Sequence, residues 1–277
     1  MRIDSHQHFW RYDPKRDNWI TDDMAVLKCD YLPHHFIPEL LASGMDACIA
    51  VQADQSEAET QLLLEFADEN PQIAGVVGWM DLLSQNVGER LQYFSQFRKL
   101  RGFRHILQSE PDDGFMMRKE FLRGVSCLAQ YGFTYDILIY PKHLPIAREF
   151  VGTFPEQKFV LDHLAKPPIK TGDIDTWAHD IRTLAMHPNV WCKLSGMVTE
   201  ADWKSWNHFD FEPYLDVVFE AFGTDRLMFG SDWPVCLVAG TYKEVKKIVE
   251  DYTRDLSADE QAQIFGRNAA NFYGLAA

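Results

Sequence analysis

The chain has 277 residues, 46% of them hydrophobic, which is enough for one large core, and its formal net charge is −14. This charge opposes nonspecific binding to nucleic acid or to an anionic membrane. No apolar run reaches membrane-spanning length, and the N-terminus enters a strand without a basic region followed by an apolar signal segment. We therefore expect a single domain over residues 1–277 in a cytoplasmic protein that acts on small molecules, without nucleic-acid or membrane partners.

Strand-like and helix-like segments alternate along the chain. A first strand runs from Arg2 to the pair His6 and His8, and a loop over residues 9–32 follows it. Buried apolar runs predict seven more strands, at residues 47–52, 73–80, 101–107, 134–140, 158–164, 190–195 and 227–231. Helical patterns predict helices at residues 33–44, 57–70, 87–100, 118–131 and 144–154, and two short ones at 261–265 and 268–273.

Apolar strands separated by amphipathic helices favour a parallel sheet, wound in one sense by right-handed crossovers. An open doubly wound sheet is the alternative, but no glycine-rich phosphate turn follows the first strand. The total of eight predicted strands is the number that closes a barrel of this kind. We therefore predict the α/β class, as a (β/α)8 TIM barrel with a short C-terminal helical extension.

The first strand ends in two histidines one residue apart. Side chains alternate along a strand, so His6 and His8 point the same way, and in a barrel that direction can be the catalytic mouth. His163 ends the sixth predicted strand and Asp232 follows the eighth, so in a closed barrel they converge on the same place. Imidazoles and a carboxylate bind divalent cations such as zinc or manganese. The alternative is that the histidines are hydrogen-bonded core residues and that Asp232 organises a turn.

Cysteine is not expected among the ligands. Five cysteines are an odd number, they are widely spaced, and none forms a Cys-x-x-Cys pair, which argues against a disulfide framework or a thiolate zinc site. They are Cys29, Cys48, Cys127, Cys192 and Cys236.

Five motifs spread over nearly the whole chain resemble the amidohydrolase superfamily, specifically its amidohydrolase-related lactonase branch, which includes L-fuconolactonases. The resemblance implies that His6, His8, His163 and Asp232 serve metal binding or acid–base chemistry, and that Arg104 and His105 form the strand-four signature of the branch. The motifs are Asp4-Ser5-His6-Gln7-His8, Gly102-Phe103-Arg104-His105-Ile106-Leu107-Gln108, Leu161-Asp162-His163-Leu164-Ala165-Lys166-Pro167, Cys192-Lys193-Leu194-Ser195-Gly196 and Phe229-Gly230-Ser231-Asp232-Trp233-Pro234.

The chain departs from the superfamily's two-metal pattern. Strand four ends in Arg104-His105 where a bridging lysine would stand, and strand five ends without a histidine. We therefore expect at most one divalent ion, zinc or manganese, which part of the branch dispenses with. Strand alternation forbids Arg104 and His105 to face inward together from a regular strand, so we expect one of them to lie on a bulge or beyond the strand and both to reach the mouth.

Aromatic, amide and cationic residues near the strand ends are candidates for binding a sugar ring. Their rings can stack on the sugar, and their polar groups can bind its hydroxyls or a carboxylate. The loop over residues 197–210, with Trp203 and Trp206, is long enough to form part of a lid. The candidate substrate-binding residues are Trp10, Trp79, Gln108, Lys166, Lys193 and Trp233.

The function that the resemblance implies is hydrolysis of a small sugar lactone, with an L-fucono-type lactone as the best single candidate. Asp232 would take the proton of the attacking water, and His105, Arg104 or a bound cation would stabilise the oxyanion. A nonoxidative decarboxylase of an aromatic or unsaturated acid and a noncatalytic sugar-acid binding protein are the alternatives. The oligomeric state does not follow from the sequence.

Overall fold

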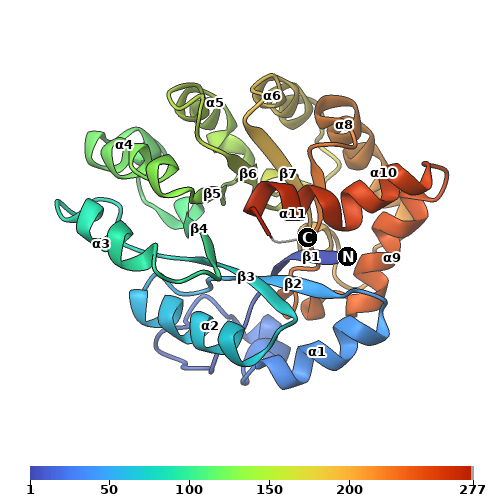
Figure 1. The fold of residues 1–277 in the computed structure, drawn as a ribbon. Coiled ribbons are helices and arrows are strands. Elements are labelled where there is room, and N and C mark those ends of the chain that lie inside the picture. The colour runs from blue at the N-terminus through green and yellow to red at the C-terminus, as the bar shows by residue number, and fades with distance from the viewer. Residues whose placement is uncertain (276–277) are drawn as a thin grey trace.

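The structure is a computed structural model that describes residues 1–275. Eight parallel strands form one sheet in the order of the sequence, and helices surround it (Figure 1). The sheet closes on itself, because Asp232 N–H donates to the His6 carbonyl at 2.8 Å and His8 N–H to the Trp233 carbonyl at 2.7 Å. The predicted TIM barrel is confirmed. The strands are β1 Ile3–Gln7, β2 Ala47–Val51, β3 Ile73–Gly78, β4 Leu100–His105, β5 Thr134–Ile137, β6 Phe159–Leu161, β7 Val190–Leu194 and β8 Leu227–Phe229.

Three of the helices begin at a polar side chain that accepts a free N–H group of the first turn. Ser56, Thr241 and Ser257 each accept from the backbone N–H three residues on, at the starts of α2, α9 and α10. The helices are α1 Pro33–Ala42, α2 Glu57–Glu69, α3 Val87–Phe94, α4 Lys119–Ser126, α5 Leu144–Gly152, α6 Asp175–Ala185, α7 Met197–Glu200, α8 Glu212–Phe222, α9 Tyr242–Thr253, α10 Ala258–Ala262 and α11 Asn268–Tyr273.

Three long helices, α6, α8 and α9, lie in segments for which the sequence analysis assigned no element. The sixth strand is shorter than predicted: it ends at Leu161 instead of continuing to residue 164. It ends there because His163, Leu164, Ala165 and Lys166 all have φ between 54° and 57°, a left-handed conformation that no strand contains. The fifth strand likewise ends at Ile137, before the predicted residue 140.

One apolar cluster fills the layer between the sheet and the helices, and a second fills the N-terminal part of the barrel. Ala269, Phe272 and Tyr273 of α11 pack into the second cluster against Ile3 and Ala47. The C-terminal extension therefore lies across the barrel end where the strands begin (Figure 1). The opposite end, where the strands finish, stays open for chemistry.

All eight strands belong to one sheet. The expectation of a single domain over residues 1–277 stays a prediction, and residues 276 and 277 lie outside the described part of the chain. Among residues 1–275, no helix combines the length and the apolar character needed to cross a membrane.

Candidate active site

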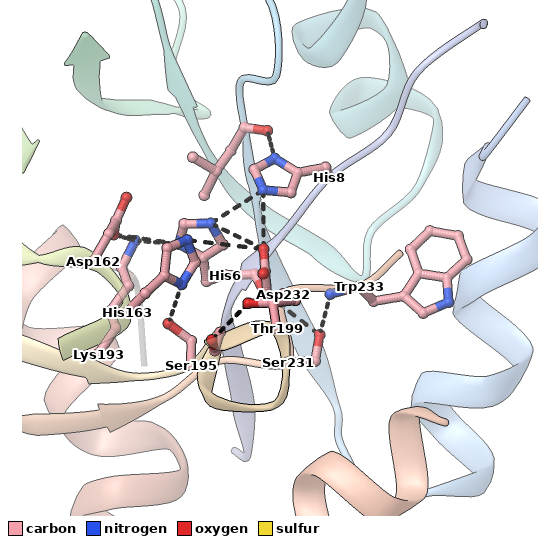
Figure 2. Close-up of polar contacts among 12 residues, drawn as sticks. His6, His8, Asp162, His163, Lys193, Ser195, Thr199, Ser231, Asp232 and Trp233 are labelled. Atoms are coloured by element: carbon pink, nitrogen blue, oxygen red, sulfur yellow. Dashed lines mark hydrogen bonds and ion pairs between the residues drawn. The ribbon is translucent and has the colours of Figure 1, made fainter. Parts of the chain in front are cut away.

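Four of the predicted residues meet at the C-terminal mouth of the barrel. Figure 2 shows the side chains of His6, His8, His163 and Asp232 pointing toward one another from the ends of β1, β6 and β8. The Nε2 atoms of His6 and His8 lie 3.2 Å apart. Asp232 Oδ1 lies 3.4 Å from His8 Nε2, 3.8 Å from His6 Nε2 and 3.9 Å from His163 Nε2.

Hydrogen bonds at the far nitrogen orient two of the rings. His8 Nδ1 lies 2.7 Å from the Val51 carbonyl, which can only accept, so this nitrogen carries the proton. His163 Nδ1 lies 2.9 Å from Ser195 Oγ. These contacts turn the Nε2 atom of each ring toward Asp232, the arrangement that metal-binding histidines usually have.

The backbone around His163 is specialised for this placement. The left-handed run from His163 to Lys166 turns the chain sharply at the end of β6. Gly196, just after β7, also has positive φ, and a Cβ atom there would come within 2.5 Å of His163 Nδ1. Glycine is therefore required at residue 196 both for its backbone conformation and for the space that the imidazole occupies.

Burial favours the neutral forms of His6 and His163, whereas neighbouring groups keep the Asp232 carboxylate charged. Burial lowers the pKa of His163 to about 4, against the attraction of Asp232, and lowers the pKa of His6 well below its usual value. Burial alone would raise the pKa of Asp232, but the nearby His163 and a hydrogen bond with His8 outweigh it and hold that pKa below the usual range. At neutral pH His6 and His163 are therefore neutral, and Asp232 is ionised.

Arg104 supplies a positive charge beside this cluster. Its side chain points from β4 into the barrel, where Nη1 donates to Asp162 Oδ2 at 3.0 Å and lies 3.3 Å from His6 Nε2. Its Nη2 donates to the Gln52 carbonyl. The guanidinium is thereby fixed at the base of the site.

Lys193 lies deeper in the barrel and contacts several strands at once. Its ammonium group donates to Asp136 Oδ2 at 2.5 Å, and lies 3.0 Å from Asp162 Oδ1 and 3.1 Å from His6 Nδ1. Tyr273 of α11 donates its hydroxyl to the same Asp136 oxygen at 2.8 Å. The lysine is fully buried, so it supports the site from below and does not reach the mouth.

The donor atoms suit a single divalent ion. A tetrahedral zinc site with Zn–N bonds of 2.0–2.1 Å places neighbouring ligand atoms about 3.3 Å apart, and the contacts among His6, His8 and Asp232 are 3.2–3.8 Å long. Two groups of three donors are close enough together, and they share His6: one adds His8 and Asp232, and the other adds Asp162 and His163. Asp162 is already paired with both Arg104 and Lys193, so the first group, extended by His163, is the better ligand set.

A cavity of about 400 Å³ opens above the cluster. The ends of seven of the strands, or the loops that follow them, contribute to its wall, as the mouth of such a barrel requires. Polar and aromatic side chains both line it, which suits a small polar ligand with an apolar ring face. The polar lining includes His8, Arg104, Gln108, Ser109, His163, Lys166, Thr199, Glu200 and Asp232, and the aromatic lining is Trp10, Trp19, Tyr140 and Trp203.

Three candidate substrate-binding residues, Trp10, Gln108 and Lys166, line this cavity, and the other three do not. Lys193 is buried beneath it. Trp233 points away from the cluster (Figure 2). Its ring stacks on Phe36 with ring centroids 4.6 Å apart.

The expectation that Arg104 and His105 both reach the mouth is wrong. β4 is regular through both residues, so alternation sends Arg104 into the barrel and His105 to the helix side. His105 stacks on Phe115 at 4.9 Å and lies 2.7 Å from Glu110. Trp79 is also outside the cavity, because its indole N–H donates to His105. These contacts make His105 and Trp79 parts of the packing around β4.

Several residues in or below the cavity were not predicted as site residues from the sequence. Asp162 could have been found, because it directly precedes His163 at a strand end. Glu200 lies on α7, a short helix in the segment that was expected to be a lid, and no motif marked it. In that segment Trp203 lines the cavity, whereas the Trp206 indole donates to the Ala239 carbonyl at 2.7 Å.

The cluster of histidines and a carboxylate lies at the C-terminal mouth of a TIM barrel, the end at which such barrels carry out their chemistry. The model of the amidohydrolase family matches residues 3–275, and the chain belongs to this family.

Two relatives are similar over nearly their whole length. An L-fucono-1,5-lactonase from Burkholderia multivorans is 44% identical, over 99% of this chain and 96% of the relative. An L-fucono-1,5-lactonase from Burkholderia ambifaria is 35% identical, over 99% and 96%. A crystal structure of an amidohydrolase from Burkholderia multivorans with bound zinc is 44% identical, covers 100% of both chains and superposes with a TM-score of 0.96.

Proposed function

We propose that this protein is a lactonase that opens a small sugar lactone to its sugar acid. The observation that carries this proposal is the 44% identity with an L-fucono-1,5-lactonase over 99% of the chain. The cluster of His6, His8, His163 and Asp232 under an open cavity supports it, because hydrolysis needs a base and polar groups beside the substrate.

The best single candidate for the substrate is L-fucono-1,5-lactone, the compound named for both relatives. The size of the cavity and its mixed lining support a sugar-sized lactone. Trp10 can stack on a ring face, and Gln108 has a side-chain oxygen, buried and without a partner among residues 1–275, that can accept a hydroxyl hydrogen bond.

In the proposed mechanism, Asp232 acts as the general base. Its carboxylate is ionised at neutral pH, so it can take a proton from water as the oxygen attacks the lactone carbonyl. The same carboxyl group then gives the proton to the ring oxygen as the ester bond breaks. Arg104 lines the cavity with a fixed positive charge and stabilises the developing oxyanion. His105 takes no part, because its ring lies on the other face of β4.

His6, His8, His163 and Asp232 would hold one divalent ion, and zinc is the first candidate because the related crystal structure contains it. A zinc ion bound there would supply a Lewis acid that lowers the pKa of water to about 7. Elemental analysis of wild-type protein and of His8→Asn tests this, and loss of bound zinc in the variant is the expected result. Activity after chelation is a separate measurement, since bound metal need not be required.

Turnover of a lactone panel tests the function itself. We expect acid release, followed with a pH indicator, from L-fucono-1,5-lactone and from stereochemically related sugar lactones. Release of carbon dioxide from aromatic acids would point to a decarboxylase, and tight binding of a sugar acid without any turnover would point to a binding protein. The cytoplasmic location stays a prediction.

A further inference from the structure

The cavity contains an ion pair that the proposed mechanism does not use. Lys166 Nζ lies 3.4 Å from Glu200 Oε1, and both residues line the cavity that Asp232 and His163 also line. Each side chain is partly exposed, 18% for Lys166 and 23% for Glu200. The pair therefore presents a cation and an anion side by side to whatever occupies the cavity.

The backbone holds both residues in place. Lys166 ends the left-handed run after β6, and its N–H donates to the His163 carbonyl at 2.7 Å. Glu200 ends α7, and its carbonyl accepts from Lys170 N–H at 3.0 Å. Because backbone hydrogen bonds hold both residues beside His163 and Asp232, the pair is well placed to orient a substrate.

The two side chains retain capacity for further hydrogen bonds. The 3.4 Å separation is long, because charge-assisted N–H···O bonds are usually 2.7–2.9 Å. Among residues 1–275, Lys166 is the one cation within 4 Å of the Glu200 carboxylate. An ammonium group has three donors and a carboxylate about four acceptor positions, so most of this capacity is free for a ligand.

Sugar hydroxyls match this pair chemically. Each hydroxyl donates one hydrogen bond and accepts others, so neighbouring hydroxyls can donate to Glu200 and accept from Lys166. The ring face of Tyr140 lies 5.7 Å from the same ammonium group and adds an aromatic wall. A lactone without hydroxyls has no donor for Glu200 and only its ester oxygens as acceptors for Lys166.

A purely structural role would be to connect the loops after β6 and β7. A second ion pair already does this outside the cavity, where Lys170 Nζ lies 3.7 Å from Asp202 Oδ2 and both side chains are exposed. The outer pair therefore provides a matched control for the inner one.

We propose that Lys166 and Glu200 bind the hydroxyl groups of the substrate, and that Glu200 sets the preference for polyhydroxylated over unsubstituted lactones. This inference rests on the proposed lactonase function. It assigns Glu200 a substrate-binding role in addition to the chemistry at Asp232.

The test compares two six-membered lactones, L-fucono-1,5-lactone and δ-valerolactone, which has the same ring without hydroxyls. Glu200→Gln and Lys166→Met are each expected to lower kcat/KM for the sugar lactone about 10- to 100-fold, the range for hydrogen bonds to charged groups, and to leave δ-valerolactone turnover close to that of wild type. Lys170→Met, the control, should leave both reactions unchanged. High enzyme concentration makes slow δ-valerolactone turnover measurable.

The outcomes separate the two proposals. If the wild-type protein hydrolyses no lactone, the lactonase function fails. If it hydrolyses lactones and both cavity variants, checked for folding by thermal unfolding, lose equal activity on the two substrates or none, the specificity role of Glu200 is overturned. Equal effects of Lys170→Met and Glu200→Gln would likewise assign the inner pair to loop structure.

Discussion

At the scale of single residues, the site depends on Asp232 being held in an uncommon conformation. Its φ is 58°, a left-handed value that aspartate and asparagine tolerate better than most residues. The next residue helps to close the barrel, since the Trp233 carbonyl accepts from His8 N–H. The carboxylate is thereby fixed against three imidazoles.

Asp232→Asn is expected to lower lactone turnover by about 10²–10⁴-fold, the usual contribution of a general acid–base group. Asparagine keeps the size of the side chain and tolerates the same φ, so the thermal unfolding temperature should change little. The measurement is kcat at saturating substrate with zinc supplied. A folded variant with near-native turnover would remove Asp232 as the proton carrier.

His105→Gln should behave in the opposite way. The ring is packed against Phe115 and bonded to Glu110, so its loss leaves buried polar groups unpaired and lowers the free energy of unfolding by about 1–3 kcal/mol. Turnover per folded molecule should remain close to that of wild type. A large drop in kcat with normal stability would show that His105 contributes to catalysis.

The pH dependence of turnover follows from the charge states of the site. In the proposed mechanism, Asp232 is ionised and His163 is neutral. The pKa of Asp232 lies below its usual range and that of His163 is about 4, so both forms are lost only on acidification. We expect kcat/KM to stay level from pH 7 down to about pH 5.5 and to fall below it. An acidic limb centred near pH 6.5, the value of an ordinary histidine, would contradict these charge states.

At the scale of elements, the turns after β6 and β7 determine where His163 points. Gly196 combines positive φ with a gap that the imidazole fills, whereas Gly132 has positive φ and no heavy atom within 4 Å of its would-be Cβ. Comparing alanine variants at the two glycines therefore distinguishes the effect of backbone strain from the effect of the contact with His163.

Gly196→Ala is expected to displace His163 and to lower both turnover and stability. Gly132→Ala should cost only backbone strain, about 1–2 kcal/mol of unfolding free energy, and leave turnover unchanged. Thermal unfolding and kcat measured on both variants check this. Equal activities of the two would show that the contact between residues 196 and 163 is unimportant.

At the scale of the whole molecule, buried charges connect the barrel to its C-terminal extension. Lys193 on β7 contacts carboxylates of β5 and β6, and Tyr273 of α11 bonds to the same Asp136. Burial raises the pKa of Asp136 to about 6, against the opposing effect of Lys193. The catalytic mouth and the closed end of the barrel therefore share one network of buried charges.

Lys193→Met should lower the free energy of unfolding by about 3–5 kcal/mol, because it leaves the buried Asp136 carboxylate without its cation and Asp162 with Arg104 alone. The control is Lys247→Met, which makes the same change in an exposed ion pair with Asp251, where the cost is at most about 1 kcal/mol. Urea unfolding of both variants measures the difference. A similar small loss in both would show that the buried network contributes little.

The sequence by itself determined the barrel and the four residues that converge at its mouth. Strand-type runs at a regular spacing predict eight parallel strands, and parallel strands bring their carboxyl ends to one mouth, so His6, His8, His163 and Asp232 could be grouped without coordinates. The number of strands and their order along the chain follow from local patterns of apolar residues, and these patterns can be read from the sequence.

Only the tertiary structure decided which way the remaining candidates face. Whether Arg104 or His105 enters the barrel depends on the register of β4, and a shift of one residue exchanges the two faces. Lys193 was a candidate for the mouth and lies beneath it, because Asp136 on β5 and Asp162 just after β6 hold it there. Glu200 carries no motif and enters the cavity through the fold of the loop after β7. Such positions depend on contacts between residues far apart in the chain, which a local pattern does not contain.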